Sequence, residues 1–374
     1  MDNNYSFTAL DAFLDTLIER GIPAFELVIK QRGKEIYRRR DGAGHKPAGN
    51  ALYFMYSCTK PVTVVSVMKL VEEGRLSLDA PVSDYLPEYA SLTVKEADGT
   101  LRPAGTVLTV RHLLTMTSGF SYNMTADVLK DMREKTGGLC TTREAVREMA
   151  RLPLGFDPGT KFRYGLSHDI LAACAEVITG EKFSDYVTRT VLEPLGMNNS
   201  FWHLSPEIEG RMEPQYTVNA ETKQVVPKLM RNGYVFGPDY DSGGAGLISS
   251  IGDMETFTEM LAAKGVGTNG VRILKEETVD LMRSQVLPHE MLDYFIPGAY
   301  GNGYTYGLGV RVCDRADNET GSPIGEFSWA GAAGSLQIVS PEKGLACFYV
   351  QHVLGTNASY IRKNLLRIIF GIVK

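Results

Sequence analysis

The sequence predicts an α+β protein with one antiparallel sheet, flanked by terminal helices, and a mostly helical second domain. Three observations predict this class. The N-terminal part offers an amphipathic helix followed by two strand-like segments, the C-terminal part offers three strand-like segments followed by a helix, and the middle of the chain carries mainly helical patterns. Strands from both ends form one sheet most simply, with the terminal helices packed on it.

The N-terminal elements follow from apolar spacing and turn residues. Apolar residues from Leu10 to Ile18 recur at helical spacing, and Gly21-Ile22-Pro23 ends that helix. The apolar segment Phe25 to Gln31 predicts a strand, Arg32-Gly33-Lys34 a hairpin turn, and Glu35 to Arg40 the returning strand.

The tail shows the complementary pattern. Strands are predicted over Glu326 to Trp329, Ser335 to Ser340 and Leu345 to Gln351, and a helix from about Ser359 to Val373. The helices expected between the two ends are Val110 to Met116, Ala126 to Lys135, Thr142 to Arg151, His168 to Thr179, Phe183 to Leu195, Asp253 to Lys264 and Glu276 to Arg283. We therefore expect residues 1–80 and 241–374 to form the sheet domain and residues 81–240 the helical domain.

Composition excludes several classes of function. A net charge of -5 leaves no basic field for nucleic acid or anionic lipid. No run of about 18 apolar residues occurs, and the polar first residues do not form a signal-peptide core, so we expect a cytoplasmic protein without a membrane partner. Five widely spaced cysteines without CxxC predict reduced thiols and no zinc site, and no cofactor motif is present.

A serine and a lysine three residues apart carry the strongest chemical signal. They stand in Ser57-Cys58-Thr59-Lys60, at the head of the apolar run Val62 to Val71. In a helix this spacing puts both side chains on one face, where the amine can take a proton from the hydroxyl. The pattern predicts a covalent serine hydrolase that needs no histidine for its nucleophile.

Two other stretches share the serine-lysine spacing, and their context differs. Ser66 lies inside the apolar run, where its hydroxyl would face the core, and Ser340 precedes a proline in a predicted turn. Ser57 stands where the extended segment Leu52 to Tyr56 meets a helix start, so its side chain and N–H can point into a cleft at the positive end of the helix dipole. Pro61 is compatible with a first helical turn.

Serine chemistry also needs a proton donor for the leaving group and two N–H donors for the oxyanion. Tyr164 lies on a loop just before a predicted helix, within Phe162-Arg163-Tyr164-Gly165-Leu166-Ser167. A predicted strand that ends in small residues, Phe327 to Gly334, offers bare backbone beside which a substrate can lie.

Along the chain, the serine-lysine pair is followed by the tyrosine and then by a strand ending WxG. With these motifs in this order, the chain resembles the serine β-lactamase and penicillin-binding protein superfamily. Its closest resemblance is to the family VIII carboxylesterases related to class C β-lactamases. The stretches Arg111 to Gly119, Glu193 to Met197 and Gly243 to Leu247 are also similar to that group.

The resemblance implies an active site in the cleft between the two domains and a role for each matching residue. Ser57 would be the nucleophile, Lys60 its base or the partner of the base, and Tyr164 the proton shuttle to the leaving alkoxide. The backbone N–H groups of Ser57 and Ala332 would form the oxyanion hole. Substrate contacts would come from Trp329, Gly331 and Leu166. Which of Lys60 and Tyr164 takes the first proton stays open.

Two departures from the β-lactamase pattern favour an uncharged ester. Tyr164-Gly165-Leu166 stands where those enzymes carry YxN, and Trp329-Ala330-Gly331 where they carry KTG. The resemblance therefore implies a carboxylesterase acting on short to medium acyl esters without a cofactor. The alternatives are a β-lactamase or D-amino-acid peptidase, an acyltransferase, and a binding domain for cell-wall fragments without turnover.

Several neighbouring residues have a second interpretation. Cys58 points away from Ser57 in a helix and is expected to be a small packing residue, and His168 is expected at the surface or as a helix cap, although it could reach the site. Five aromatic residues on loop-like segments could line an apolar acyl pocket: Tyr122, Tyr234, Phe236, Tyr240 and Tyr306.

Overall fold

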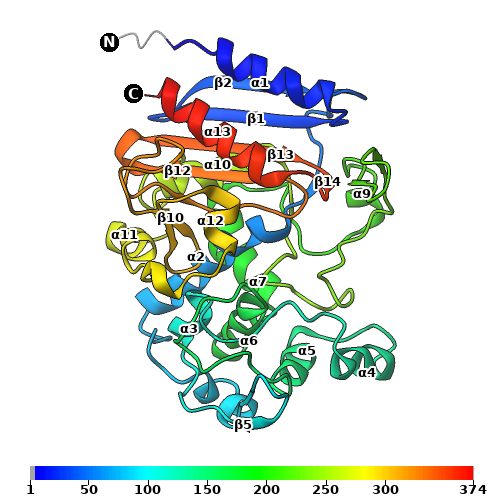
Figure 1. Cartoon of the computed structure of the whole chain (residues 1–374), viewed down its shortest axis with the longest axis vertical. Helices are drawn as coiled ribbons and strands as arrows, with labels where there is room; N and C mark the ends of the chain where they lie inside the picture. Colours follow the sequence, from blue (N-terminus) through cyan, green and yellow to red (C-terminus); the bar gives the residue numbers. More distant parts are fainter. Residues whose placement is uncertain (1–4, 374) are drawn as a thin grey trace.

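The computed structural model describes residues 5–373, so the polar start of the chain, residues 1–4, lies outside the described residues. Its centre is a seven-stranded antiparallel sheet of order β2-β1-β13-β12-β11-β10-β9. Both ends of the chain therefore contribute to one sheet (Figure 1). The strands are β1 (Phe25–Gln31), β2 (Lys34–Asp41), β9 (Tyr304–Tyr306), β10 (Arg311–Cys313), β11 (Phe327–Ser328), β12 (Leu336–Ser340) and β13 (Leu345–Gln351).

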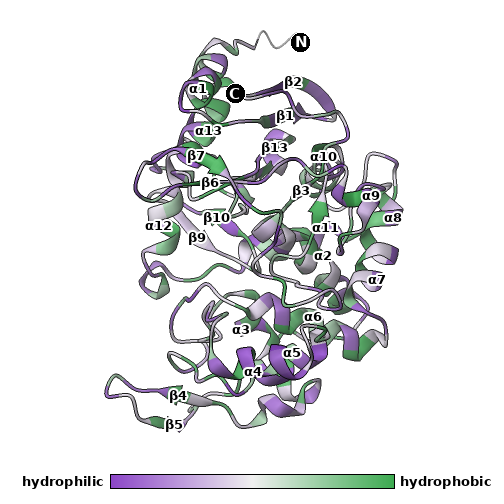
Figure 2. Ribbon diagram, turned by 90° about the vertical axis from the view of Figure 1, so that its right-hand side faces the viewer, coloured by the Kyte–Doolittle hydropathy of each residue, from purple (hydrophilic) through white to green (hydrophobic). Residues whose placement is uncertain are grey.

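Helices cover both faces of this sheet. Helices α1 (Thr8–Glu19) and α13 (Ala358–Ile372) contact each other on one face, and α10 (Ile251–Ala262) packs on the other (Figure 2). Because strand side chains alternate, Leu27 belongs to the core under α1 and α13, whereas Val28 belongs to the core under α10.

A helical region at the other end of the molecule is built around α6 (Ser167–Thr179) (Figure 1). The first nine residues of α6 are buried, since this helix contacts α2 (Thr59–Glu72), α3, α5 and α7. A helix that is apolar on most sides lies inside a core. The surrounding helical segments are α3 (Val110–Leu114), α4 (Asp127–Lys135), α5 (Thr142–Met149), α7 (Phe183–Val187), the π-helical turn η4 (Thr188–Leu192) and α8 (Glu193–Leu195).

Short elements connect these parts. β3 (Tyr53–Phe54) pairs with β8 (Ile248–Ser249), which brings the segment before Ser57 next to the glycine-rich segment 243–246. The other strands are β4 (Thr93–Lys95), β5 (Leu101–Pro103), β6 (Tyr216–Val218), β7 (Val225–Pro227) and β14 (Val353–Leu354). The other helices are α9 (Pro206–Glu209), α11 (Glu276–Ser284) and α12 (Phe295–Tyr300), with short 3₁₀ turns η1 (Tyr56–Cys58), η2 (Val82–Asp84), η3 (Pro87–Ala90), η5 (His289–Met291) and η6 (Pro341–Lys343).

The predicted α+β class and the antiparallel sheet with terminal helices are confirmed. The helix predicted over Phe183 to Leu195 is three consecutive segments, because a π-helical turn precedes Pro194. The domain limits at residues 80 and 240 stay a prediction. All five cysteines are buried and free. Within residues 5–373, the helices are too short or too polar to cross a bilayer.

Candidate active site

Ser57 lies in η1, directly before α2, and the residue in front of it is strained. Tyr56 has a φ of +48°, a left-handed conformation that side chains other than glycine rarely adopt. Its buried ring and a 2.6 Å hydrogen bond between its hydroxyl and the Gln215 amide hold it there. The Met55 N–H also donates to the Leu247 carbonyl at 2.9 Å. Packing therefore imposes the turn that presents Ser57.

Lys60 is fully buried in the first turn of α2, and its amine faces Ser57. The Nζ atom lies 3.5 Å from Ser57 Oγ, and it donates to the Gly244 carbonyl and the Tyr122 hydroxyl at 2.7 Å each. It also lies 4.8 Å from the centre of the Tyr164 ring. The amine is thus held by neutral groups, beside the serine hydroxyl.

This surrounding changes the protonation of the lysine. Burial lowers the pKa of Lys60 from 10.5 to about 7, although the carboxylate of Asp169 opposes the shift. Desolvation disfavours the charged form of an amine, and a nearby anion favours it. A substantial fraction of Lys60 is therefore neutral at pH 7 and able to accept a proton.

Tyr164 also lies next to Ser57, on the loop just before α6. Its hydroxyl is hydrogen-bonded with Ser57 and accepts the Trp329 indole N–H at 3.0 Å. Burial raises the pKa of Tyr164 well above its usual range, and the bonds with Ser57, Trp329 and Tyr122 oppose this. Tyr164 therefore stays protonated at neutral pH and can donate to an oxygen atom near Ser57.

The turn from Trp329 to Ser335 packs directly on the segment that leads to Ser57. The Ser335 hydroxyl donates to the Met55 carbonyl at 3.3 Å, and a Cβ atom on Gly331 would lie 2.5 Å from the same oxygen. Glycine is therefore required at this close approach. Ala332 follows at the partly exposed tip of the turn, on the side of the segment that carries Ser57.

Two of the residues expected to contact substrate are buried, and their contact with substrate stays a prediction. The Leu166 and Trp329 side chains are each about 1% exposed and belong to the hydrophobic cores. Trp329 packs against Tyr306 and Tyr300, so it reaches the site through the Tyr164 hydroxyl and not by an open ring face.

His168 was expected at the surface, and the structure corrects this: the ring is fully buried and neither nitrogen finds a partner among residues 5–373. Burial holds the pKa of His168 well below its usual range, so its ring is neutral at pH 7. Cys58 is a buried packing residue as expected, and burial raises the pKa of its thiol to about 11.

Sequence reasoning missed the role of Tyr122 in this geometry. We expected it to line an apolar pocket, but its hydroxyl is a direct partner of Lys60. Tyr234 packs edge-on against both Tyr122 and Tyr56, whereas Tyr240 is buried and donates to Asp169. The sequence showed only that a tyrosine follows the stretch Arg111 to Gly119. It gave no indication that this tyrosine contacts Lys60.

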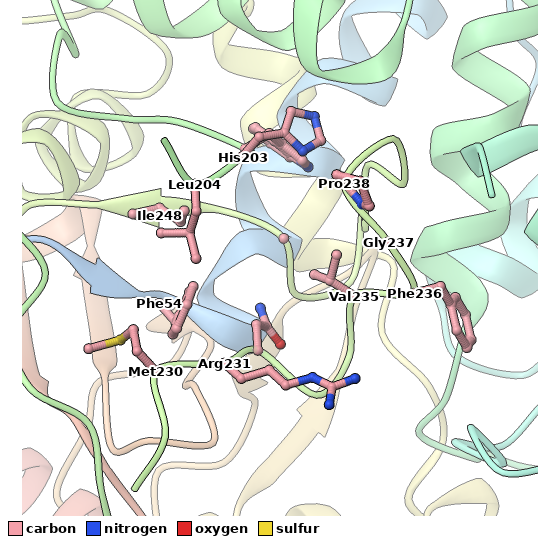
Figure 3. Close-up of a pocket in the computed structure, with 13 residues that line it drawn as sticks. Phe54, His203, Leu204, Met230, Arg231, Val235, Phe236, Gly237, Pro238 and Ile248 are labelled. Carbon is pink, nitrogen blue, oxygen red and sulfur yellow. The ribbon is translucent and has the colours of Figure 1, made fainter. Parts of the chain in front are cut away.

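A cavity of about 290 Å³ lies beside this site, between β3, β8 and the loop of residues 230–238 (Figure 3). It does not include Ser57, but Phe54 and Gly246 connect its walls to the segments that carry Ser57 and Gly244. Its lining is mostly apolar, with polar groups from His203, Arg231 and Asn232. The apolar side chains are those of Phe54, Trp202, Leu204, Met230, Val235, Phe236, Pro238 and Ile248.

The fold is of the β-lactamase/transpeptidase-like type, and a serine, a lysine and a tyrosine lie together at one of its turns. Residues 10–370 match the family model described as Beta-lactamase, and the chain belongs to that family.

One relative in sequence and two solved structures of similar fold stand out. Esterase EstB from Burkholderia gladioli is 30% identical, over 94% of this chain and 90% of its own. The solved structure of EstCE1, described as a hydrolase with promiscuous acyltransferase activity, has a TM-score of 0.75 and 24% identity, covering 96% of this chain and 97% of its own. Simvastatin synthase (LovD) from Aspergillus terreus has a TM-score of 0.78 and 22% identity, covering 97% of both chains.

Proposed function

We propose that the protein is a carboxylesterase that cleaves short to medium acyl esters of small molecules through an acyl-Ser57 intermediate, without a cofactor. The observation that carries the proposal is the buried Lys60 amine, 3.5 Å from Ser57 Oγ and with a pKa of about 7. A general base works best when its pKa lies near the operating pH.

The proposed reaction has two halves. Ser57 Oγ attacks the ester carbonyl and its proton passes to Lys60, while the N–H groups of Ser57 and Ala332 hold the developing oxyanion. The Tyr164 hydroxyl gives its proton to the leaving alkoxide and is reprotonated from Lys60. Water then attacks the acyl group and the same residues act in the reverse order, which releases the acid and restores Ser57.

The neutral character of the site favours esters over β-lactams. Trp329 and Leu166 replace the lysine and the asparagine of the β-lactamase motifs, and both side chains are buried. The cation and the amide expected to meet a β-lactam are thus missing at these positions. The cavity walled by Phe54, Val235 and Ile248 is apolar, as an acyl chain requires.

Acyl transfer to an alcohol other than water is the second candidate. It needs the same acyl-Ser57 intermediate, and EstCE1 is described as combining hydrolase and acyltransferase activity. The intact set of Ser57, Lys60 and Tyr164 argues against a domain that binds cell-wall fragments without turnover.

The test is the initial rate of p-nitrophenyl butyrate hydrolysis by the wild type and by Ser57→Ala, with a chromogenic cephalosporin in parallel. We expect ester cleavage that is lost in Ser57→Ala and little cephalosporin turnover. Cephalosporin turnover without ester cleavage would replace the esterase by a β-lactamase. An added alcohol that accepts the butyryl group faster than water does would favour the acyltransferase.

A further inference from the structure

We propose that Asp169 is a positioning residue that sets the charge of Lys60 through the gap left by Gly244. The inference rests on the proposed function, since it concerns the base of that reaction. Asp169 does not touch the reacting atoms; it acts on Lys60 through space and through the loop that holds the lysine.

Asp169 lies in the first turn of α6 and is about 1% exposed. Its Oδ1 atom accepts hydrogen bonds from the hydroxyls of Tyr240 and Ser242, each at 2.7 Å. Burial raises the pKa of this carboxyl, while the two hydroxyls and the nearby Lys60 oppose that rise. Two hydroxyl donors on one oxygen and the nearby Lys60 amine favour the ionised form of the carboxyl against this burial.

The absence of a side chain at Gly244 leaves the Asp169 carboxylate close to Lys60. A Cβ atom on Gly244 would lie 2.7 Å from Asp169 Oδ2, 3.3 Å from the Tyr122 hydroxyl and 3.4 Å from Lys60 Nζ. The carboxylate and the amine therefore face each other across the space that a side chain would fill. The Gly244 carbonyl also accepts a hydrogen bond from Lys60 at 2.7 Å. Gly244 therefore both holds the amine and leaves the space across which the carboxylate acts on it.

The other titratable groups around Lys60 are neutral at pH 7. Burial raises the pKa of Tyr122, Tyr164 and Cys58, and it lowers the pKa of His168. Arg362 from α13 acts electrostatically on Tyr164 and Cys58. Within residues 5–373, Lys60 and Asp169 make no direct ion pair, but the charge of Asp169 favours the protonated amine.

The consequence is a lysine held near the point of half protonation. Burial without an anion would lower the pKa of Lys60 further, so that the amine would be too weak a base. A direct ion pair would raise the pKa and keep the amine charged. An anion that is separated from the amine by the space at Gly244 gives a pKa between these two extremes. A base that must both take and return a proton requires such a pKa.

Asp169→Asn tests the proposal, because the amide oxygen can still accept from Tyr240 and Ser242. The readout is the titration midpoint of Lys60, by NMR of protein labelled at the lysine ε-carbon and assigned with Lys60→Met. We expect the midpoint to move down by about one to two pH units, as for loss of a nearby unit charge. The acid limb of the ester pH–rate profile should move in the same direction.

Asp241→Asn is the matched control. Asp241 is as buried as Asp169 and precedes Gly244 by three residues, but it pairs with His203 at 2.7 Å and is not among the groups that act on Lys60. Its neutralisation should leave the Lys60 midpoint in place. If Asp169→Asn does not fold, Gly244→Ala replaces it, since the added methyl group would push the carboxylate aside and lower the midpoint.

An unmoved midpoint in the folded variant, or an equal shift in Asp241→Asn, would overturn the proposal. The titration does not depend on turnover, so its result is separate from that of the proposed function. Absence of ester cleavage by the wild type would contradict the proposed esterase activity. A shifted midpoint would still support the proposed effect of Asp169 on Lys60.

Discussion

The Trp329 indole is a residue whose place in the site differs from what its sequence position suggests. Its ring fills the core between Tyr300 and Tyr306, and its N–H is donated to the Tyr164 hydroxyl at 3.0 Å. A hydrogen bond to the hydroxyl oxygen favours the tyrosinate form and fixes where the proton points. Trp329 therefore prepares Tyr164 for proton transfer.

Trp329→Phe should lower kcat for p-nitrophenyl butyrate about fivefold, because loss of one hydrogen bond costs about 1 kcal/mol. The phenyl ring retains most of the packing, so KM should change little. Trp202→Phe is the matched control, since the Trp202 indole N–H has no acceptor among residues 5–373. Equal losses of kcat in both variants would mean that the bond to Tyr164 has no catalytic part.

Residues close in sequence were the predictable part of the site. Ser57 and Lys60 are three residues apart on one helical turn, so their geometry follows from local spacing. Tyr122 lies 62 positions after Lys60, on a loop without a regular pattern, and its contact depends on how α2 and that loop pack. The burial of Leu166 and Trp329 also depends on packing between elements, so spacing could not reveal it.

At the scale of elements, predicted strand and helix bounds were most accurate where the periodicity was long. β1 and β13 match the predicted segments residue for residue, because each is seven residues long and rich in apolar side chains. β9 and β10 were not predicted, since each is only three residues long and lies among glycines. Short strands take their conformation from the neighbouring strands of the sheet and not from their own pattern.

The loop of residues 230–238 and the segment after Phe201 enclose the cavity that Phe54 and Gly246 also line (Figure 3). If acyl chains enter this cavity, Leu204→Trp should fill part of it. We expect kcat/KM for p-nitrophenyl octanoate to fall about tenfold relative to the acetate ester, as for the lost burial of about two CH₂ groups.

Leu229→Trp is the control for the chain-length experiment. Leu229 is 77% exposed on the same loop region and does not line the cavity. Its octanoate-to-acetate ratio should equal that of the wild type. An unchanged ratio in Leu204→Trp would assign the acyl chain to another surface.

At the scale of the whole molecule, the buried Lys60 opposes folding. The pKa of Lys60 is about 7 in the folded chain and 10.5 in its ordinary range, so between these values the unfolded chain binds more protons than the folded one. The contribution of Lys60 to stability therefore rises with pH across this window and is most unfavourable below pH 7.

Lys60→Met removes this pH dependence. The free energy of unfolding of the wild type, relative to that of Lys60→Met, should rise by about 1.4 kcal/mol per pH unit between pH 7 and pH 10. Urea unfolding at pH 7, 8 and 9 measures it. A difference that stays flat over this range would mean that Lys60 remains charged in the folded protein.

The measurement that tests the central claim most directly is the trapping of the acyl-enzyme. Wild type and Ser57→Ala are mixed with p-nitrophenyl butyrate, quenched in acid within the first turnovers, and examined by intact mass and peptide mapping. We expect one butyryl group on the wild type, on the peptide that contains Ser57, and none on Ser57→Ala. Ester cleavage without an adduct at Ser57, or an adduct on another residue, would contradict the account.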